Sequence, residues 1–228
     1  MLACTKGNGL NDCAILTRYT MIAILNYGMG NLASIQNMFK KVGVPSRHIT
    51  TADEIYAAQA LIIPGVGKFD HAMRQIASMG LREALEQAAL VRKIPILGIC
   101  LGMQLMTCSS EEGQLPGLGW IKATTRLIDG ASQNLRVPHM GWNLVTIKKS
   151  SPYFDDEFAE YRFYFVHSYA VQCDDPADIL TTTEYAGEFV SSFSIDNFVG
   201  VQFHPEKSHK FGACFLERFA MVHGLCAS

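Results

Sequence analysis

The residues of this chain best suited to chemistry are a cysteine and a histidine that each follow an apolar run. Residues 94–99 indicate a buried strand and residues after Gly102 a helix, so Cys100 falls on a sharp turn with G-x-C-x-G spacing. This is the cysteine version of a nucleophile elbow, whose glycines let the backbone bend and leave the side chain exposed. The helix start favours a thiolate over a thiol. The competing interpretation is a buried structural cysteine.

A thiolate nucleophile needs a base, and the base needs a carboxylate to orient it. The stretch Gly-Val-Gln-Phe-His-Pro-Glu at 200–206 supplies both groups at the end of a predicted strand. Residues i and i+2 of an extended chain point to the same side, so His204 and Glu206 can share one face. Alone, this motif would indicate an exposed loop histidine. Together with the elbow it favours a triad of Cys100, His204 and Glu206.

The elements that must position these groups alternate between short apolar strands and helices. We predict strands at 22–25, 47–50, 60–63 and 94–99, and helices at 32–42, 69–79 and 81–92. Such alternation predicts an α/β fold with a mostly parallel, flavodoxin-like central sheet and flanking helices. Active sites in these sheets lie beyond the carboxyl ends of the strands. The turns at 26–31 and 64–67 are therefore expected beside the elbow.

From about residue 117 the chain changes to alternating β-branched and aromatic patterns. These predict an antiparallel C-terminal extension of the sheet and a last helix at 211–222. We predict a single domain at 21–228, preceded by a poorly ordered extension at 1–20. The expected strands are 120–128, 143–147, 162–166, 169–172, 179–184, 189–194 and 198–203.

Composition excludes several functions. The net charge of −2 and the absence of a basic run give no reason to expect nucleic acid. No apolar run is long enough to span a membrane. Seven scattered cysteines without C-x-x-C predict no metal site and indicate free thiols in a reducing cytoplasm. Gly28, Gly30 and Ala33 have dinucleotide-fingerprint spacing, but Asp53 is poorly placed for the ribose, so we predict a tight turn and no cofactor.

The motifs resemble those of class I, triad-type glutamine amidotransferases, and closely those of the glutaminase subunit of imidazole glycerol phosphate synthase. The elbow and the His-Pro-Glu motif are shared by the whole class. Pro-Gly-Val-Gly, Pro-His-Met-Gly-Trp-Asn and Phe-Val-His-Ser-Tyr indicate the subfamily. The matching stretches are 27–31, 64–67, 98–104, 110–113, 138–143, 164–169 and 200–208.

The resemblance implies a role for each matching residue. Cys100 would attack the side-chain amide of glutamine, His204 would move the proton, and Glu206 would orient His204. The oxyanion would be bound by the Leu101 N–H and by the turn that contains Val66 and Gly67. The residues implied to bind the substrate are Gly65, Gln104, Glu112, Ser168 and Tyr169. We interpret His139 and His167, which lie in matching motifs, as structural.

The same resemblance implies a partner. Released ammonia would pass to a (β/α)₈-barrel cyclase in a heterodimer that makes imidazole glycerol phosphate and aminoimidazole carboxamide ribonucleotide in histidine biosynthesis. The isolated subunit would be a poor glutaminase. The positions that match the barrel-facing surface are Asn31, Trp142, Tyr164 and Lys207. Core packing is the competing interpretation for the two aromatic residues.

Three other functions remain open at this stage. A paralogous glutaminase could feed a synthase that amidates a sugar of a surface polysaccharide. Two departures from the histidine enzyme keep this open: Ile121-Lys122-Ala123, where a glycine is common, and Asn26, where an aspartate is frequent. A cysteine peptidase on the same scaffold is disfavoured by Gln104 and Glu112, which suit an amino-acid substrate. A non-catalytic binding subunit is disfavoured by the complete triad.

Overall fold

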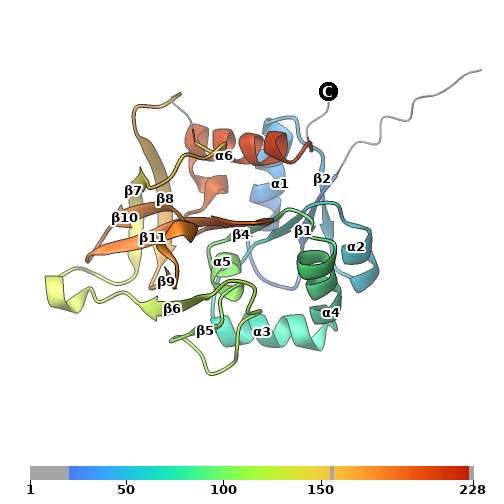
Figure 1. Ribbon diagram of the computed structural model, residues 1–228, viewed down its shortest axis with the longest axis horizontal. Coiled ribbons are helices and arrows are strands. Elements are labelled where there is room, and N and C mark those ends of the chain that lie inside the picture. Colours follow the sequence, from blue (N-terminus) through green and yellow to red (C-terminus); the bar gives the residue numbers. More distant parts are fainter. Residues whose placement is uncertain (1–20, 155–156, 226–228) are drawn as a thin grey trace, which may run out of the picture.

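The computed structural model describes residues 21–225 except 155–156. The predicted extension at 1–20 lies outside these described residues. The sheet has the strand order β2-β1-β3-β4-β12-β11-β10-β7-β8, with β5, β6 and β9 joined at the side. Figure 1 shows it running through the centre of the molecule between two groups of helices.

The first half of the sheet is parallel, as predicted. Its strands are β2 (Ser46–Ile49), β1 (Ile22–Leu25), β3 (Leu61–Ile63), β4 (Ile96–Ile99) and β12 (Phe198–Val201). All but β2 are buried along their whole length, which explains why they are continuous apolar runs rather than alternating ones. The last strand, β12, returns from late in the chain and lies beside the elbow strand β4.

The second half is antiparallel. It comprises β11 (Glu188–Ile195), β10 (Ile179–Glu184), β7 (His139–Ile147) and β8 (Tyr161–His167). A side branch is formed by β5 (Ser109–Ser110), β6 (Ala123–Leu127) and β9 (Tyr169–Cys173), and β9 pairs with β11. The predicted antiparallel C-terminal extension is thus confirmed.

Helices cover both faces of the sheet. On one face, α1 (Leu32–Lys41) packs against α6 (His209–Val222). The other face carries α3 (Phe69–Ser78), α4 (Arg82–Glu86), which continues as a π-helical turn at Gln87–Val91, and α5 (Leu101–Leu105). The short α2 (Ala52–Ala57) begins with a capping box between Thr51 and Glu54 and contacts α4.

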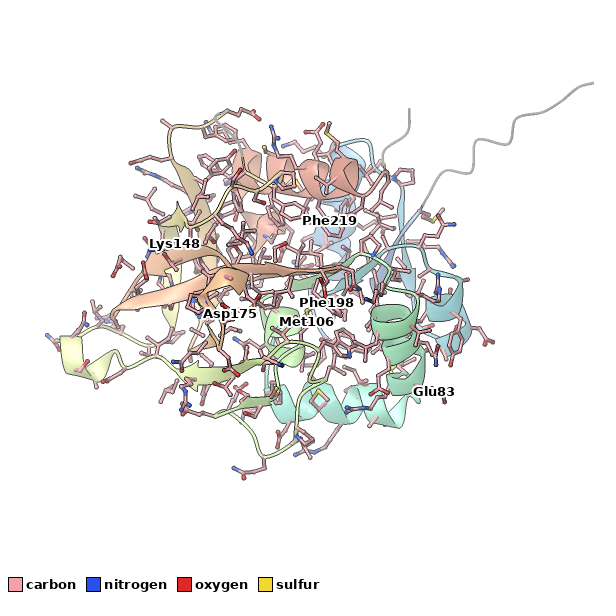
Figure 2. All side chains as sticks on the ribbon, viewed as in Figure 1. Glu83, Met106, Lys148, Asp175, Phe198 and Phe219 are labelled. Atoms are coloured by element: carbon pink, nitrogen blue, oxygen red, sulfur yellow. The ribbon has the colours of Figure 1, made fainter. Side chains whose placement is uncertain are left out.

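Two hydrophobic clusters, one on each side of the sheet, hold these layers together. Phe219 of α6 belongs to one cluster, and Met106 and Phe198 belong to the other. Figure 2 shows the three residues in this arrangement. Because both faces are packed, open space for a ligand is expected only at the strand ends and loops. None of the helices among the described residues is long and apolar enough to cross a membrane.

Candidate active site

Cys100 lies at the turn between β4 and α5, where the sequence predicts a nucleophile elbow. Its backbone is in a conformation rare for a non-glycine residue, with φ 54° and ψ −110°. Strain of this kind costs about 1–3 kcal/mol and is typical of functional sites. Leu101 begins α5, so its N–H has no partner within the helix and can bind an anion beside the sulfur.

The glycines of the elbow act differently from the prediction. The positive φ falls on Cys100 itself, whereas Gly98 and Gly102 supply space. A Cβ on Gly98 would lie 2.7 Å from the Gly102 carbonyl oxygen, and a Cβ on Gly102 would overlap the Ile63 carbonyl. The glycines therefore let α5 pack closely on the sheet. The sulfur-bearing residue is also buried, at 6% exposure, rather than exposed.

His204 follows the end of β12, next to β4. Since Val201 pairs with Ile99 in parallel register, the two strands end together and bring His204 to the same edge as Cys100. The His204 N–H donates to the Tyr164 carbonyl at 2.9 Å. Its ring Nδ1 lies 2.8 Å from Glu206 Oε1, and both side chains are only 2% exposed. An N–H at Nδ1 donating to the carboxylate fixes the tautomer and leaves Nε2 available.

The electrostatics of His204 suit a group that carries a proton. Although burial alone would lower its pKa, the Cys100 sulfur and the Glu206 carboxylate raise the pKa of His204 to about 10. Its Nε2 is buried and has no hydrogen-bond partner among the described residues. At neutral pH the ring is therefore an imidazolium, and the proton on Nε2 is the one that it can deliver to a leaving group.

The turn predicted to bind the oxyanion is anchored from β1. The Tyr27 hydroxyl donates to the Pro64 carbonyl at 2.6 Å, and burial followed by the nearby Cys100 sulfur raises the pKa of Tyr27. Gly67 has a φ of +103°, a conformation that favours glycine. Val66 is 43% exposed, so the turn is held at its first residue and open at its tip.

A pocket of about 270 Å³ lies over Cys100. Its wall contains eight of the predicted site residues, and Pro138, Val166 and His167 complete it. The eight are Val66, Gly67, Cys100, Leu101, Gln104, Glu112, Ser168 and Tyr169. Gly65 lies behind the wall, where a Cβ would meet the Leu101 Cβ at 2.8 Å. The structure thus brings the predicted nucleophile, oxyanion turn and substrate residues to one cavity.

The substrate-binding residues are themselves held in place. Gln104 Nε2 donates to the Tyr169 carbonyl and to Gln202 Oε1, each at 3.0 Å. Glu112 Oε2 accepts the Phe69 N–H at 2.9 Å, so this carboxylate also caps the start of α3. The Ser168 carbonyl accepts a hydrogen bond from the Ile128 N–H, and this bond holds the Ser168 backbone in place in the pocket wall.

Three of the four residues predicted to face a partner form one surface cluster. Trp142 is 46% exposed, so core packing does not describe it, and its ring stacks on His209 with centroids 5.4 Å apart. Tyr164 lies opposite Trp142 on β8, and Lys207 Nζ is 5.6 Å from the Tyr164 ring centroid. The fourth, Asn31, caps α1 through its side chain, which accepts the Ser34 N–H at 3.4 Å.

Sequence reasoning missed two polar features beside the sulfur. Gln202 Nε2 lies 3.6 Å from Cys100 Sγ, and the Val166 carbonyl lies 3.9 Å from it. His167, interpreted from sequence as structural, lines the pocket and pairs with His139 at 3.0 Å. The polar Gln202 within the apolar run at 198–203, just after the end of β12, is the signal that could have found the first.

Chemically, this arrangement can transfer an acyl group to sulfur and then to water, so the site defines a cysteine acyl-transfer enzyme. The chain belongs to the glutamine amidotransferase class-I family, whose model matches residues 23–222. The family prediction from sequence is confirmed, and the chain is an enzyme of this type.

Comparisons with individual proteins agree with this family. The chain is 50% identical over 199 residues to imidazole glycerol phosphate synthase subunit HisH 2 of Methanococcus maripaludis, covering 87% of this chain and 98% of the relative. It is 43% identical over 204 residues to subunit HisH of Bdellovibrio bacteriovorus, covering 89% and 100%.

Solved structures show the same fold. A crystal structure of a glutamine amidotransferase matches with a TM-score of 0.70 at 13% identity, covering 89% of this chain and 98% of that one. The glutaminase domain of Trypanosoma brucei CTPS with bound acivicin matches with a TM-score of 0.60 at 18% identity, covering 92% and 98%. At these identities the likeness establishes the fold alone.

Proposed function

We propose that this chain is the glutaminase subunit of an imidazole glycerol phosphate synthase. It hydrolyses glutamine to glutamate and ammonia, and a (β/α)₈-barrel cyclase uses the ammonia to make imidazole glycerol phosphate and aminoimidazole carboxamide ribonucleotide in histidine biosynthesis. The observation that supports the proposal is Cys100 in the wall of a pocket, next to a buried His204–Glu206 pair whose imidazole interacts with its sulfur, in a chain 50% identical to a HisH subunit.

The reaction proceeds in two acyl-transfer steps. The Cys100 thiolate forms a bond to the side-chain amide carbon of glutamine, and the C–N bond breaks as the protonated His204 gives its proton to the departing ammonia. Water then attacks the thioester, His204 takes a proton from that water, and the C–S bond breaks to release glutamate and the thiolate. The Leu101 N–H and the Val66–Gly67 turn stabilise both oxyanions.

The pocket suits the amino-acid end of glutamine. Both amide hydrogens of Gln104 are donated within the protein, so its Oε1 is the atom left to accept a hydrogen bond from the substrate ammonium. The Glu112 carboxylate supplies a negative charge on the same wall of the pocket. These two groups favour a free α-ammonium over a peptide bond, which argues against a peptidase.

An apolar face beside the pocket suits a protein partner. Alternate residues of β7 are exposed on this face: Met140 at 62%, Trp142 at 46% and Leu144 at 39%. Val166, which lines the pocket, pairs with Met140 across the two strands. Exposed apolar patches mark interaction sites, and this one adjoins the point where ammonia is released. We assign it to the barrel cyclase, with Asn31, Tyr164 and Lys207 at the same interface.

The cellular setting follows from the same proposal. The cysteines that the structure describes, at 100, 108, 173 and 214, are all free thiols. Free thiols suit the reducing cytoplasm, where we place the complex.

The proposal is tested by mixing the chain with the barrel cyclase and measuring glutamine-dependent formation of imidazole glycerol phosphate. We expect glutamine hydrolysis to be slow for the chain alone and fast in the complex. The matched control is the Cys100→Ala complex, which should make product from ammonium salts and none from glutamine. Glutamine-dependent product from that variant would rule out the mechanism. An active glutaminase that never supports the cyclase would instead favour the sugar-amidating alternative.

A further inference from the structure

Gln202 is a buried polar residue whose place in the chain the triad does not explain. It stands between Val201 and Phe203 in an apolar run, and its exposure is 0%. Its Oε1 accepts a hydrogen bond from Gln104, and its Nε2 lies 3.6 Å from the Cys100 sulfur. Burying an amide costs free energy unless it is hydrogen-bonded. The two contacts satisfy both ends of the Gln202 side chain.

The direction of these hydrogen bonds is fixed by one backbone carbonyl. The Tyr169 carbonyl receives Gln104 Nε2 at 3.0 Å and His167 Nδ1 at 2.9 Å. Because a carbonyl oxygen can only accept, the Gln104 amide must turn its nitrogen toward Tyr169 and, with its second hydrogen, toward Gln202. The Gln202 oxygen therefore faces Gln104, and its nitrogen must face Cys100.

A second chain of hydrogen bonds extends from the same Tyr169 carbonyl toward β7. His167 donates from Nδ1 to Tyr169, so its Nε2 accepts from His139 Nδ1 at 3.0 Å, and His139 Nε2 accepts from Asn143 Nδ2 at 3.3 Å. Burial lowers the pKa of His139 to about 4, and chiefly burial lowers that of His167 to about 3. Two neutral rings, each with one donor and one acceptor, complete this pattern without conflict.

We propose that Gln202 is a positioning residue of the glutaminase reaction: its amide nitrogen donates to the Cys100 sulfur and holds it as a thiolate over the pocket. This inference rests on the proposed function. A neutral donor suits this position because it cannot take the proton that His204 must hold. It also favours departure of the thiolate when the thioester is hydrolysed.

The test compares alkylation of Cys100 by iodoacetamide across pH in the full chain and in two variants. Gln202→Met removes the donor at similar volume, and Gln202→Glu places a carboxyl at the same position. The titratable residues around this sulfur are His204 and Tyr27, which interact with it, and Glu112 and His167, which line the same pocket. All four are unchanged in both variants. Peptide mapping follows Cys108 as well, an exposed thiol in the same chain that serves as an internal reference.

Loss of one hydrogen bond to an anion is expected to move the midpoint of Cys100 alkylation up by about one pH unit in Gln202→Met and by more in Gln202→Glu. The kcat/KM for glutamine should fall about tenfold in Gln202→Met. The Cys108 profile should not move. The matched control is Gln36→Met on α1. It removes one amide hydrogen bond to the Ser46 carbonyl of β2 and should behave as the unsubstituted chain.

Folded variants that alkylate Cys100 with the unsubstituted midpoint would overturn the proposal. Should the variants fail to fold, the unsubstituted chain gives the answer by NMR: the Gln202 side-chain amide should shift when Cys100 is alkylated, and an unmoved signal would contradict the contact. Alkylation needs no glutamine. A chain that shows the expected midpoints but hydrolyses no glutamine, alone or with the cyclase, would therefore defeat the proposed function and leave the hydrogen bond established.

Discussion

Replacing Glu206 by Gln tests how the triad holds its proton. The carboxylate lies 2.8 Å from His204 Nδ1, and both side chains are 2% exposed, so solvent screens this contact little. Charge-assisted hydrogen bonds of this kind contribute about 1.5–3 kcal/mol. Removing the charge should therefore reduce kcat/KM for glutamine by about 10–150-fold.

The alkaline limb of kcat/KM should move in a definite direction in this variant, and a general loss of structure would not move it. Although burial lowers the pKa of His204, the nearby Cys100 sulfur and the hydrogen-bonded Glu206 carboxylate raise it to about 10. Without the carboxylate the imidazolium is less stable, so the pKa of His204 should fall by about one to two units. The alkaline limb of kcat/KM should move to lower pH by the same amount.

The assay is glutamate release by the complex with its barrel partner, measured between neutral and alkaline pH. Glu83→Gln, on the exposed side of α4 and away from the pocket, is the matched control (Figure 2). Circular dichroism establishes that each variant is folded. A folded Glu206→Gln enzyme with unchanged kcat/KM and an unchanged alkaline limb would refute the assignment of this carboxylate.

Three further predictions concern the surroundings of the triad. Tyr27→Phe leaves the buried Pro64 carbonyl unpaired, so the free energy of unfolding in urea should fall by about 1–3 kcal/mol and kcat should fall with it; unchanged values would contradict the anchoring role. Gly102→Ala inserts a methyl group into the backbone of β3 and should abolish the folded state or glutamine turnover, so a stable, active variant would disprove the packing argument. Because burial lowers the pKa of His139 to about 4 and of His167 to about 3, the folded chain binds fewer protons than the unfolded chain below pH 6.5. Its unfolding free energy should therefore fall between about pH 6.5 and 4, and less steeply in His139→Phe; parallel curves would contradict the neutral pair.

The parallel half of the fold could be predicted from sequence because each strand is a short apolar run followed by a turn. In this half the predicted strand bounds at 22–25 agree with the structure, and the predicted helix at 81–92 is confirmed as α4 with its π-helical continuation. In the antiparallel half the predicted bounds at 179–184 also agree. The pairing of β12 with β4 could be expected only through chemistry: a nucleophile at 100 and a base at 204 need adjacent strand ends.

The physical reason for the elbow glycines could not be read from the sequence. Spacing alone indicates a tight turn, and glycine at positive φ is the usual cause of one. In the structure Cys100 takes that conformation, while Gly102 is required because the Ile63 carbonyl approaches from another strand. A requirement set by a distant backbone atom leaves no local pattern.

The polar groups around the sulfur were also hidden from sequence reasoning. His139 and His167 lie 28 residues apart, and their contact depends on the pairing of β7 with β8. Gln104 and Gln202 meet across 98 residues. A polar residue in an apolar run, such as Gln202, indicates that the side chain has a partner, but the spacing does not say which one. The partners are identified only when the strands are placed together.

The most direct test of the central claim is to trap the acyl-enzyme. The complex is mixed with glutamine, quenched in acid within one turnover, and its peptides are analysed by mass spectrometry. We predict one glutamyl group on Cys100, formed in step with the first release of ammonia, and none in His204→Ala on the same timescale. Ammonia released at the full rate with Cys100 unmodified, or with the glutamyl group on another residue, would contradict the account.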